Sequence, residues 1–271
     1  MSRVRFAAIQ MNSHDNVSVN INTAVDLLDR AAGDGAVLAV LPENFAGMGR
    51  DEAYRVSIAE QDGSGQIQDC LSAAALRNKM WIIGGTVPLR GDDPQRPFAA
   101  CLVFDNQGRR VARYDKIHLF DVAIPDRDER YRESAYTTPG KEPLLLDTPW
   151  GGLGVAVCYD LRFPEMFRFH RAAPMDILAV PAAFTFTTGQ AHWELLLRAR
   201  AIENLCYVVA AAQTGIHPGG RHTWGHSMII DPWGQKLDVL DDDVDSVSGE
   251  VDAGYLSSIR EKFPALSHRR L

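Results

Sequence analysis

The sequence has few of the features that mark membrane, secreted or disulfide-stabilised proteins. No apolar stretch reaches the roughly 18 residues that a bilayer-spanning helix needs, and the N-terminal MSRVRFAAIQMN lacks the apolar region of a signal peptide. The chain has only four cysteines, Cys70, Cys101, Cys158 and Cys206, and no CxxC pair. This pattern suggests neither a disulfide framework nor a structural zinc site. We therefore expect a cytoplasmic protein that does not bind a membrane.

The chain also has fewer basic than acidic residues. The chain has 28 Lys and Arg residues against 35 Asp and Glu, which gives a net charge of −7 and argues against a nucleic-acid partner. No GxGxxG or P-loop motif is present, so we expect no nucleotide cofactor. His217, His222 and His226 lie close together in the sequence, but their spacing is neither HExxH nor that of a zinc finger. We therefore expect no metal and no cofactor.

The pattern of apolar residues predicts a layered α/β fold. The chain has 271 residues, of which 46% are hydrophobic, enough to build a sizeable core. Short apolar runs alternate with longer amphipathic ones, and no linker, repeat or low-complexity segment interrupts them, so we expect one domain over residues 1–271. The expected strands are 4–9, 36–41, 81–87, 101–104, 111–114, one near 144, 153–158, 177–180, 207–212, 227–230 and 247–251. The expected helices are 21–28, 67–79, one after Pro164, 191–204 and 255–262.

Three of the expected strands lead into chemically reactive residues. AVLAVLPE ends at Glu43, RRVARYDK at Lys116 and GLGVAVC at Cys158. Ligand sites in α/β proteins collect at the carboxyl ends of strands, so a carboxylate, an ammonium and a thiol could converge on one pocket. Each residue also has a structural explanation, because Glu43 could cap a helix or form a local salt bridge, Lys116 could lie on the surface and Cys158 could fill the core. Composition and spacing leave both interpretations open.

Several long stretches of the sequence resemble the nitrilase (carbon–nitrogen hydrolase) superfamily. They are LPENF, RYDKIHLFD, GVAVCYDLRFPE, AHWELLLRARAIEN and GHSMIIDPWG, and the resemblance extends over essentially the whole chain. It implies a four-layer α-β-β-α sandwich, with two sheets face to face and helices outside. Members of the superfamily pair into an eight-layer homodimer. Here the contact would involve the region after Cys158 and the helix 191–204, whose inward candidates are Leu195, Leu196 and Ala199.

The resemblance also assigns roles to the reactive residues. Cys158 would attack an amide carbonyl, because an activated thiolate is a strong nucleophile. Glu43 would be the general base that takes the thiol proton and returns it to the departing nitrogen. Lys116 would stabilise the negative oxygen, helped by the backbone N–H of Tyr159.

A second glutamate completes the pattern of the superfamily. The block RYRES places it at Glu133, which would orient Lys116 and the substrate. Glu142 is the alternative, and we prefer Glu133 because the SAYTTPG that follows also fits the family. Two carboxylates around one buried ammonium are physically sensible, because an unpaired buried lysine is costly.

Arg162 and two threonines are the candidate substrate-binding residues. A guanidinium binds a carboxylate bidentately, and related carbamoylases use an arginine at the corresponding place for this purpose. The structural alternative for Arg162 is a salt bridge with Asp160 or Glu165. Thr187 and Thr188, in the stretch FTFTTG, could line the same pocket, although only their position in the sequence supports this.

The residues within these motifs narrow the resemblance to one branch of the superfamily. CYDLRFPE, CYVVAAAQ and GHSM most resemble the deaminated-glutathione amidases. The implied function is hydrolysis of the terminal amide of a small 2-oxo carboxylate through a cysteine thioester, with release of an acid or peptide product and ammonia. The alternatives are an omega-amidase acting on α-ketoglutaramate, an N-carbamoyl amino acid hydrolase, and a non-enzymatic scaffold protein.

Overall fold

Two β-sheets form the centre of the molecule. The computed structural model describes residues 3–123, 129–168 and 174–270. The seven-stranded sheet contains β1 (Val4–Ile9), β2 (Ala36–Val40), β3 (Trp81–Ile83), β4 (Val87–Leu89), β5 (Phe98–Phe104), β6 (Arg110–Asp115) and β17 (Ser246–Val251). Its order is β17-β1-β2-β3-β5-β4, with β6 paired to β5.

The second sheet has six strands. They are β9 (Leu144–Thr148), β10 (Gly151–Val155), β11 (Ile177–Ala182), β12 (Tyr207–Ala212), β15 (Met228–Ile230) and β16 (Lys236–Val239). Their order is β16-β15-β12-β11-β10-β9. Two small hairpins pair β7 (Asp121–Ala123) with β8 (Arg130–Arg132) and β13 (Thr214–Ile216) with β14 (His222–Trp224).

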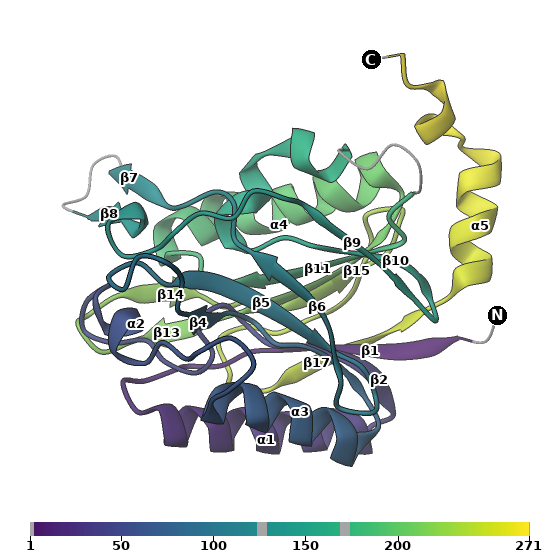
Figure 1. Cartoon of the computed structure of the whole chain (residues 1–271). Coiled ribbons are helices and arrows are strands. Elements are labelled where there is room, and N and C mark those ends of the chain that lie inside the picture. Colours follow the sequence, from purple (N-terminus) through teal and green to yellow (C-terminus); the bar gives the residue numbers. More distant parts are fainter. Residues whose placement is uncertain (1–2, 124–128, 169–173, 271) are drawn as a thin grey trace.

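Helices cover the outer faces of both sheets (Figure 1). Helices α1 (Val17–Gly33) and α3 (Gln66–Asn78) lie on the seven-stranded sheet, whereas α4 (Phe186–Asn204) lies on the six-stranded sheet. The expected four-layer α-β-β-α sandwich is therefore confirmed. Two short helices, α2 (Tyr54–Ser57) and α5 (Ala253–Lys262), lie outside these layers, and 3₁₀ turns cover Glu133–Ala135, Cys158–Arg162, Pro164–Arg168 and Ala265–His268. Among the described helices, none is both long and apolar enough to cross a bilayer.

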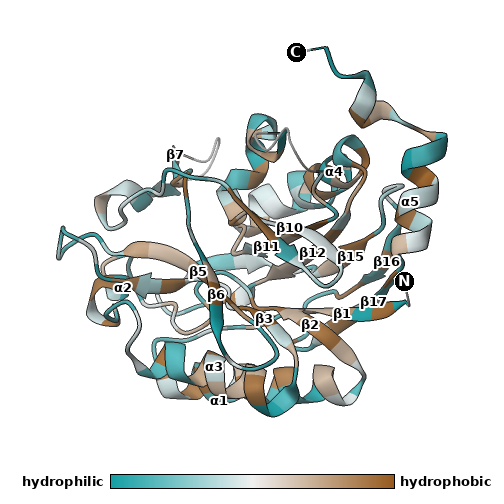
Figure 2. Ribbon diagram, turned by 45° about the vertical axis from the view of Figure 1, so that its right-hand side comes forward, coloured by the Kyte–Doolittle hydropathy of each residue, from teal (hydrophilic) through white to brown (hydrophobic). Residues whose placement is uncertain are grey.

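The two-sided burial of the strands explains their sequences. In β1, Phe6 and Ala8 belong to the core that includes both sheets, whereas Ala7 and Ile9 pack in the core formed with α1 and α3. A strand that is buried on both faces needs a nearly continuous apolar sequence, which VRFAAI provides. Figure 2 shows the apolar β1 and β2 beside helices of mixed hydropathy. This difference allows strands and helices to be distinguished from sequence.

The structure corrects several expected boundaries. Strand β10 ends at Val155, and Cys158 opens a 3₁₀ turn instead of ending the strand. The expected helix after Pro164 is also a 3₁₀ turn, and the expected strand 81–87 divides into β3 and β4. No strand or helix is expected between residues 115 and 143, whereas the structure places β7, β8 and a 3₁₀ turn there.

The expected inward residues of α4 are right only in part, because Leu196 packs against the core whereas Leu195 does not. Leu195 is 68% exposed, and Leu196 and Ala199 are only partly buried. The buried apolar positions are instead Trp193, Leu197 and Ala201, which follow one another at four-residue intervals. Because the helix is apolar on more than one side, spacing alone did not identify the side that faces the sheet.

Candidate active site

Segments from both sheets bring the expected reactive residues together. Glu43 lies just beyond β2 and Lys116 directly follows β6, both in the seven-stranded sheet. Cys158 lies beyond β10, which belongs to the six-stranded sheet. All three line one pocket, together with Glu133. The site therefore forms where strand ends of two facing sheets meet, and not along the edge of a single sheet.

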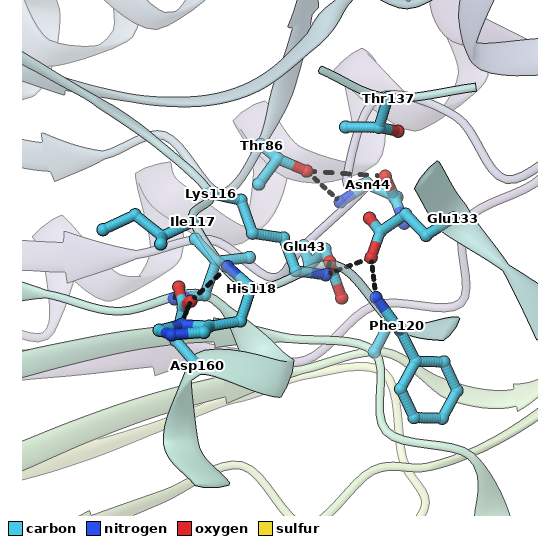
Figure 3. Close-up of polar contacts among 12 residues, drawn as sticks. Glu43, Asn44, Thr86, Lys116, Ile117, His118, Phe120, Glu133, Thr137 and Asp160 are labelled. Carbon is cyan, nitrogen blue, oxygen red and sulfur yellow. Dashed lines mark hydrogen bonds and ion pairs between the residues drawn. The ribbon is translucent and has the colours of Figure 1, made fainter. Parts of the chain in front are cut away.

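Lys116 lies between two carboxylates in the interior. Its Nζ is 2.7 Å from Glu43 Oε1 and 2.8 Å from Glu133 Oε2, and its side chain is only 2% exposed (Figure 3). Burial alone lowers the pKa of Lys116, but attraction to Glu133 and Glu43 outweighs it and raises the pKa above its ordinary value. A surface role for Lys116 is therefore wrong, and the site contains a fixed positive charge.

Glu133 is held from several directions. Its Oε1 accepts from Arg55 Nη1 at 3.1 Å, and its Oε2 accepts from the backbone N–H of Phe120 at 2.8 Å. Burial alone raises the pKa of Glu133, but the charges of Lys116 and Arg55 overcome this effect and hold the pKa well below its usual value. The alternative residue, Glu142, is exposed. The structure therefore places Glu133, and not Glu142, against the lysine.

The backbone at Cys158 has an unusual conformation. Its φ is +49°, in the left-handed region that residues other than glycine rarely adopt. The thiol lies close enough to the Glu43 carboxylate and to the Ala183 backbone for both to act on its pKa. Burial, followed by the negative charge of Glu43, raises the pKa of the thiol. The resting sulfur is therefore protonated, and it needs a base before it can act as a nucleophile.

Asp160 connects the 3₁₀ turn that begins at Cys158 with strand β6 and the residues that follow it. This fully buried carboxylate accepts from the Val157 N–H at 2.8 Å, from the Tyr114 hydroxyl at 2.7 Å and from the His118 N–H at 3.0 Å. Tyr114 belongs to β6, and the His118 ring stacks on Phe163. Asp160 thus fixes the backbone on both sides of the pocket.

Arg162 lines the same pocket. Its guanidinium lies over the rings of Tyr159, at 5.9 Å, and Phe184, at 5.4 Å. Its Nη1 is 3.3 Å from Nδ1 of His192. Within the described ranges no carboxylate forms an ion pair with Arg162, and the two acidic neighbours considered above are not its partners. A guanidinium without an acidic partner is therefore available at the pocket.

The structure separates the two candidate threonines. Thr188 lines the pocket together with Thr185, and their hydroxyl oxygens are 2.8 Å apart. Thr187 is not among the lining residues, because each helical residue is rotated by about 100° from its neighbour. Thr185 could have been found from its position, since it is the residue that caps α4.

Several charged residues of the pocket were missed by the sequence analysis. Arg55, Glu52 and Arg221 line the pocket, and Arg55 pairs with both Glu52 and Glu133. One indirect signal for Arg55 was present, because Glu133 beside a single lysine leaves a second buried carboxylate to be balanced. The pocket is narrow, with a volume of about 20 Å³.

The three neighbouring histidines have separate partners. His217 contacts the Ser13 carbonyl at 2.9 Å and the Thr223 hydroxyl at 2.7 Å, and burial lowers its pKa to about 4. The His222 ring stacks on Phe186 and the His226 ring on Trp224. Across the described part of the chain, no group of three or more His, Cys, Asp or Glu side chains could hold a metal ion.

Comparison with known proteins agrees with this architecture. The carbon–nitrogen hydrolase family model matches residues 5–261. Deaminated glutathione amidase of Yersinia enterocolitica is 42% identical over 271 residues, covering 100% of this chain and 94% of that protein. Omega-amidase NIT2 of Danio rerio is 34% identical, with 100% and 96% covered. The crystal structure of the Caenorhabditis elegans NitFhit protein superposes with a TM-score of 0.90 at 37% identity, over 100% of this chain and 66% of that one. The chain belongs to the carbon–nitrogen hydrolase family and has the nitrilase-superfamily fold.

Proposed function

We propose that the protein is an amidase that hydrolyses deaminated glutathione through a thioester on Cys158. The observation that carries this proposal is the buried Lys116, which lies between Glu43 and Glu133 beside the thiol. This arrangement supplies a nucleophile, a base and a fixed positive charge within one pocket. The 42% identity to a deaminated glutathione amidase supports the choice of substrate.

The first half of the reaction forms the thioester. The sulfur of Cys158 attacks the amide carbonyl carbon while Glu43 takes the thiol proton. The carbonyl oxygen becomes negative and is stabilised by Lys116 Nζ and the backbone N–H of Tyr159. Glu43 then transfers the proton to the amide nitrogen, the carbon–nitrogen bond breaks and the amine leaves. The acyl group remains on Cys158.

The second half regenerates the enzyme. Glu43 removes a proton from a water molecule, which attacks the thioester carbon. The new negative oxygen again lies against Lys116, and the carbon–sulfur bond breaks when the intermediate collapses. The sulfur regains a proton from Glu43, and the carboxylic acid leaves. Glu133 keeps Lys116 in place throughout, because its own hydrogen bonds to Arg55 and Phe120 do not involve the substrate.

The acyl half of the substrate is a 2-oxo acid. Deaminated glutathione is glutathione with an oxo group in place of the glutamate amine, so its hydrolysis yields 2-oxoglutarate and cysteinylglycine. Arg162 has no acidic partner in the described chain, and it is suited to bind the carboxylate beside the oxo group. α-Ketoglutaramate has the same acyl half and releases ammonia. It is the second candidate, because omega-amidase NIT2 is also a relative.

A substrate panel tests the proposed function. Purified protein is offered deaminated glutathione, α-ketoglutaramate, an N-carbamoyl amino acid and a small nitrile, and the acid, amine and ammonia products are measured. We expect the highest kcat/KM with deaminated glutathione. A higher value with α-ketoglutaramate would favour the omega-amidase alternative, and no turnover of any compound would favour a non-enzymatic role.

Arg162→Lys is expected to weaken catalysis although it keeps the positive charge. A lysine cannot form two parallel hydrogen bonds to one carboxylate. The loss of a hydrogen bond to a charged group costs about 1.5–3 kcal/mol, so kcat/KM for deaminated glutathione should fall roughly 10- to 100-fold. Steady-state kinetics measure this change.

Two controls accompany the Arg162 variant. Arg168→Lys alters an exposed arginine outside the catalytic pocket and should change kcat/KM little. An ω-amide that lacks the 2-oxo acid carboxylate should be equally poor for the wild type and for Arg162→Lys. If the variant loses the same factor on both amides, Arg162 supports the loop and does not bind the carboxylate.

A further inference from the structure

A second, larger pocket adjoins the catalytic pocket. Its volume is about 560 Å³, within the roughly 300–1000 Å³ typical of small-molecule sites. The two pockets share part of their walls, because four residues line both of them. These residues are Asn44, Glu52, Arg55 and Arg221.

The second pocket lies on the side of the general base. Asn44 directly follows Glu43 and lines both pockets. In the proposed reaction Glu43 gives its proton to the leaving nitrogen, so the leaving group must lie on this side. Arg162 and Thr188 line only the catalytic pocket. The acyl half therefore lies toward Arg162, and the leaving half extends into the second pocket.

Arg221 stands where the two pockets meet. Its Nη1 donates to Glu52 at 3.2 Å and its Nη2 donates to the Ala183 carbonyl at 3.1 Å, while its guanidinium lies 5.2 Å from the Tyr131 ring centre. Its buried Nε has no hydrogen-bond partner in the described structure. Glu52 also pairs with Arg55, so one carboxylate serves two guanidinium groups. Arg221 thus retains hydrogen-bonding capacity for a further acceptor.

The charges around the second pocket favour an anion. Its ionisable lining comprises four arginines and three acidic residues, besides a histidine. They are Arg50, Arg55, Arg130, Arg221, Asp51, Glu52, Glu129 and His222. One of the carboxylates, Glu129, already accepts the Tyr131 hydroxyl at 3.0 Å. The arginines of this lining thus outnumber its carboxylates by one, in a protein whose net charge is −7.

We propose that the second pocket is a leaving-group subsite and that Arg221 binds the carboxylate of a peptide leaving group. This inference rests on the proposed function and specifies its substrate class. The leaving group of deaminated glutathione is a dipeptide that ends in a glycine carboxylate. An extended dipeptide spans roughly 7 Å, which carries this carboxylate out of the catalytic pocket. The ammonia that leaves α-ketoglutaramate would not use the subsite.

The test compares two forms of the leaving group. We measure kcat/KM for deaminated glutathione and for the same compound with its glycine carboxylate converted to a carboxamide. The wild type should prefer the acid by at least about 10-fold, the lower end for a charged hydrogen bond. Arg221→Met keeps the length of the side chain but removes its charge, and it should bring the ratio of the two values close to one. Arg50→Met, an exposed arginine on the rim of the same pocket, should keep most of the preference.

The outcomes separate this inference from the proposed function. If the wild type shows no preference for the acid, the subsite is wrong whatever the variant does. A preference that survives in Arg221→Met, or that Arg50→Met abolishes instead, would also overturn the role of Arg221. α-Ketoglutaramate is the reference substrate. If the wild type hydrolyses it but does not prefer deaminated glutathione over the carboxamide, the proposed chemistry at the acyl group still holds. If the wild type hydrolyses none of the three compounds, the proposed function is overturned instead.

Discussion

Cys158→Ala should lower kcat for deaminated glutathione by at least about 10⁴-fold, the scale seen when a covalent nucleophile is removed. The proposed reaction passes through a thioester, and alanine cannot form one. The substitution removes only a sulfur atom from a side chain that is already buried, and it leaves the contacts of Lys116 with Glu43 and Glu133 in place. We therefore expect an inactive protein with an unchanged circular dichroism spectrum. Turnover at a sizeable fraction of wild type would contradict the assignment of the nucleophile.

Trapping the intermediate gives an independent check on this assignment. Mass spectrometry of acid-quenched wild-type enzyme should find the acyl group on Cys158 and on no other cysteine. Cys101 and Cys206 are buried, and burial raises the pKa of both thiols, that of Cys206 to about 12. Cys70 lies on α3 outside the catalytic pocket, so Cys70→Ala is the matched control and should retain turnover. An acyl adduct on any of these three cysteines would contradict the assignment of Cys158 as the nucleophile.

The layered fold was largely predictable because its strands are buried on both faces. Strand β1 occupies the range expected from VRFAAI, and the expected strands 101–104 and 111–114 fall within the paired strands β5 and β6. Errors arose where burial did not decide the local structure. The apolar run before Cys158 continues past the point where sheet pairing stops, so the strand was extended too far. The homodimer stays a prediction, and the exposed Leu195 and Ile202 of α4 lie on the helix expected to form its contact.

The candidate site was predictable only in part, for a related reason. Glu43, Lys116 and Cys158 each follow a strong strand signal, so the sequence places them at strand ends. Arg55 and Arg221 have no such signal, because they come from a short helix and from the segment before β14. Their relation to the site depends on which loops the two facing sheets bring together, and local patterns do not contain this information.

The buried cluster also explains why the site is arranged before substrate binds. Lys116 is fixed by two carboxylates, and Glu133 is fixed in turn by Arg55 and a backbone N–H. A positive charge held rigidly in the interior stabilises a developing oxyanion without reorganisation. The two glutamates are nevertheless not equivalent, because Glu43, and not Glu133, acts on the pKa of the Cys158 thiol. This difference permits a direct test of the general base.

Glu43→Gln should lower kcat by at least about 10³-fold, within the range for the loss of a general acid–base group. Glu133→Gln is the matched control, since each substitution removes one negative charge and one acceptor beside Lys116 while keeping side-chain shape. The control should lose less, roughly 10- to 100-fold, because Glu133 positions Lys116 and exchanges no proton with the substrate. Steady-state kinetics with deaminated glutathione, together with thermal unfolding of both variants, would measure the difference. Equal losses would mean that the two carboxylates act only as partners of the lysine.

Alkylation of Cys158 separates the loss of the base from the loss of the nucleophile. In the wild type, burial first and then the charge of Glu43 raise the pKa of the thiol. Glu43→Gln removes the second cause, so the pKa should fall, although burial keeps it above the ordinary value. The variant should therefore react with iodoacetamide at a rate that rises with pH, and at a given alkaline pH faster than Glu133→Gln, even though its turnover is nearly abolished. This rate is measured by mass spectrometry of Cys158. A Glu43→Gln thiol that reacts no faster than the thiol of Glu133→Gln at the same pH would contradict the effect of the Glu43 charge on Cys158.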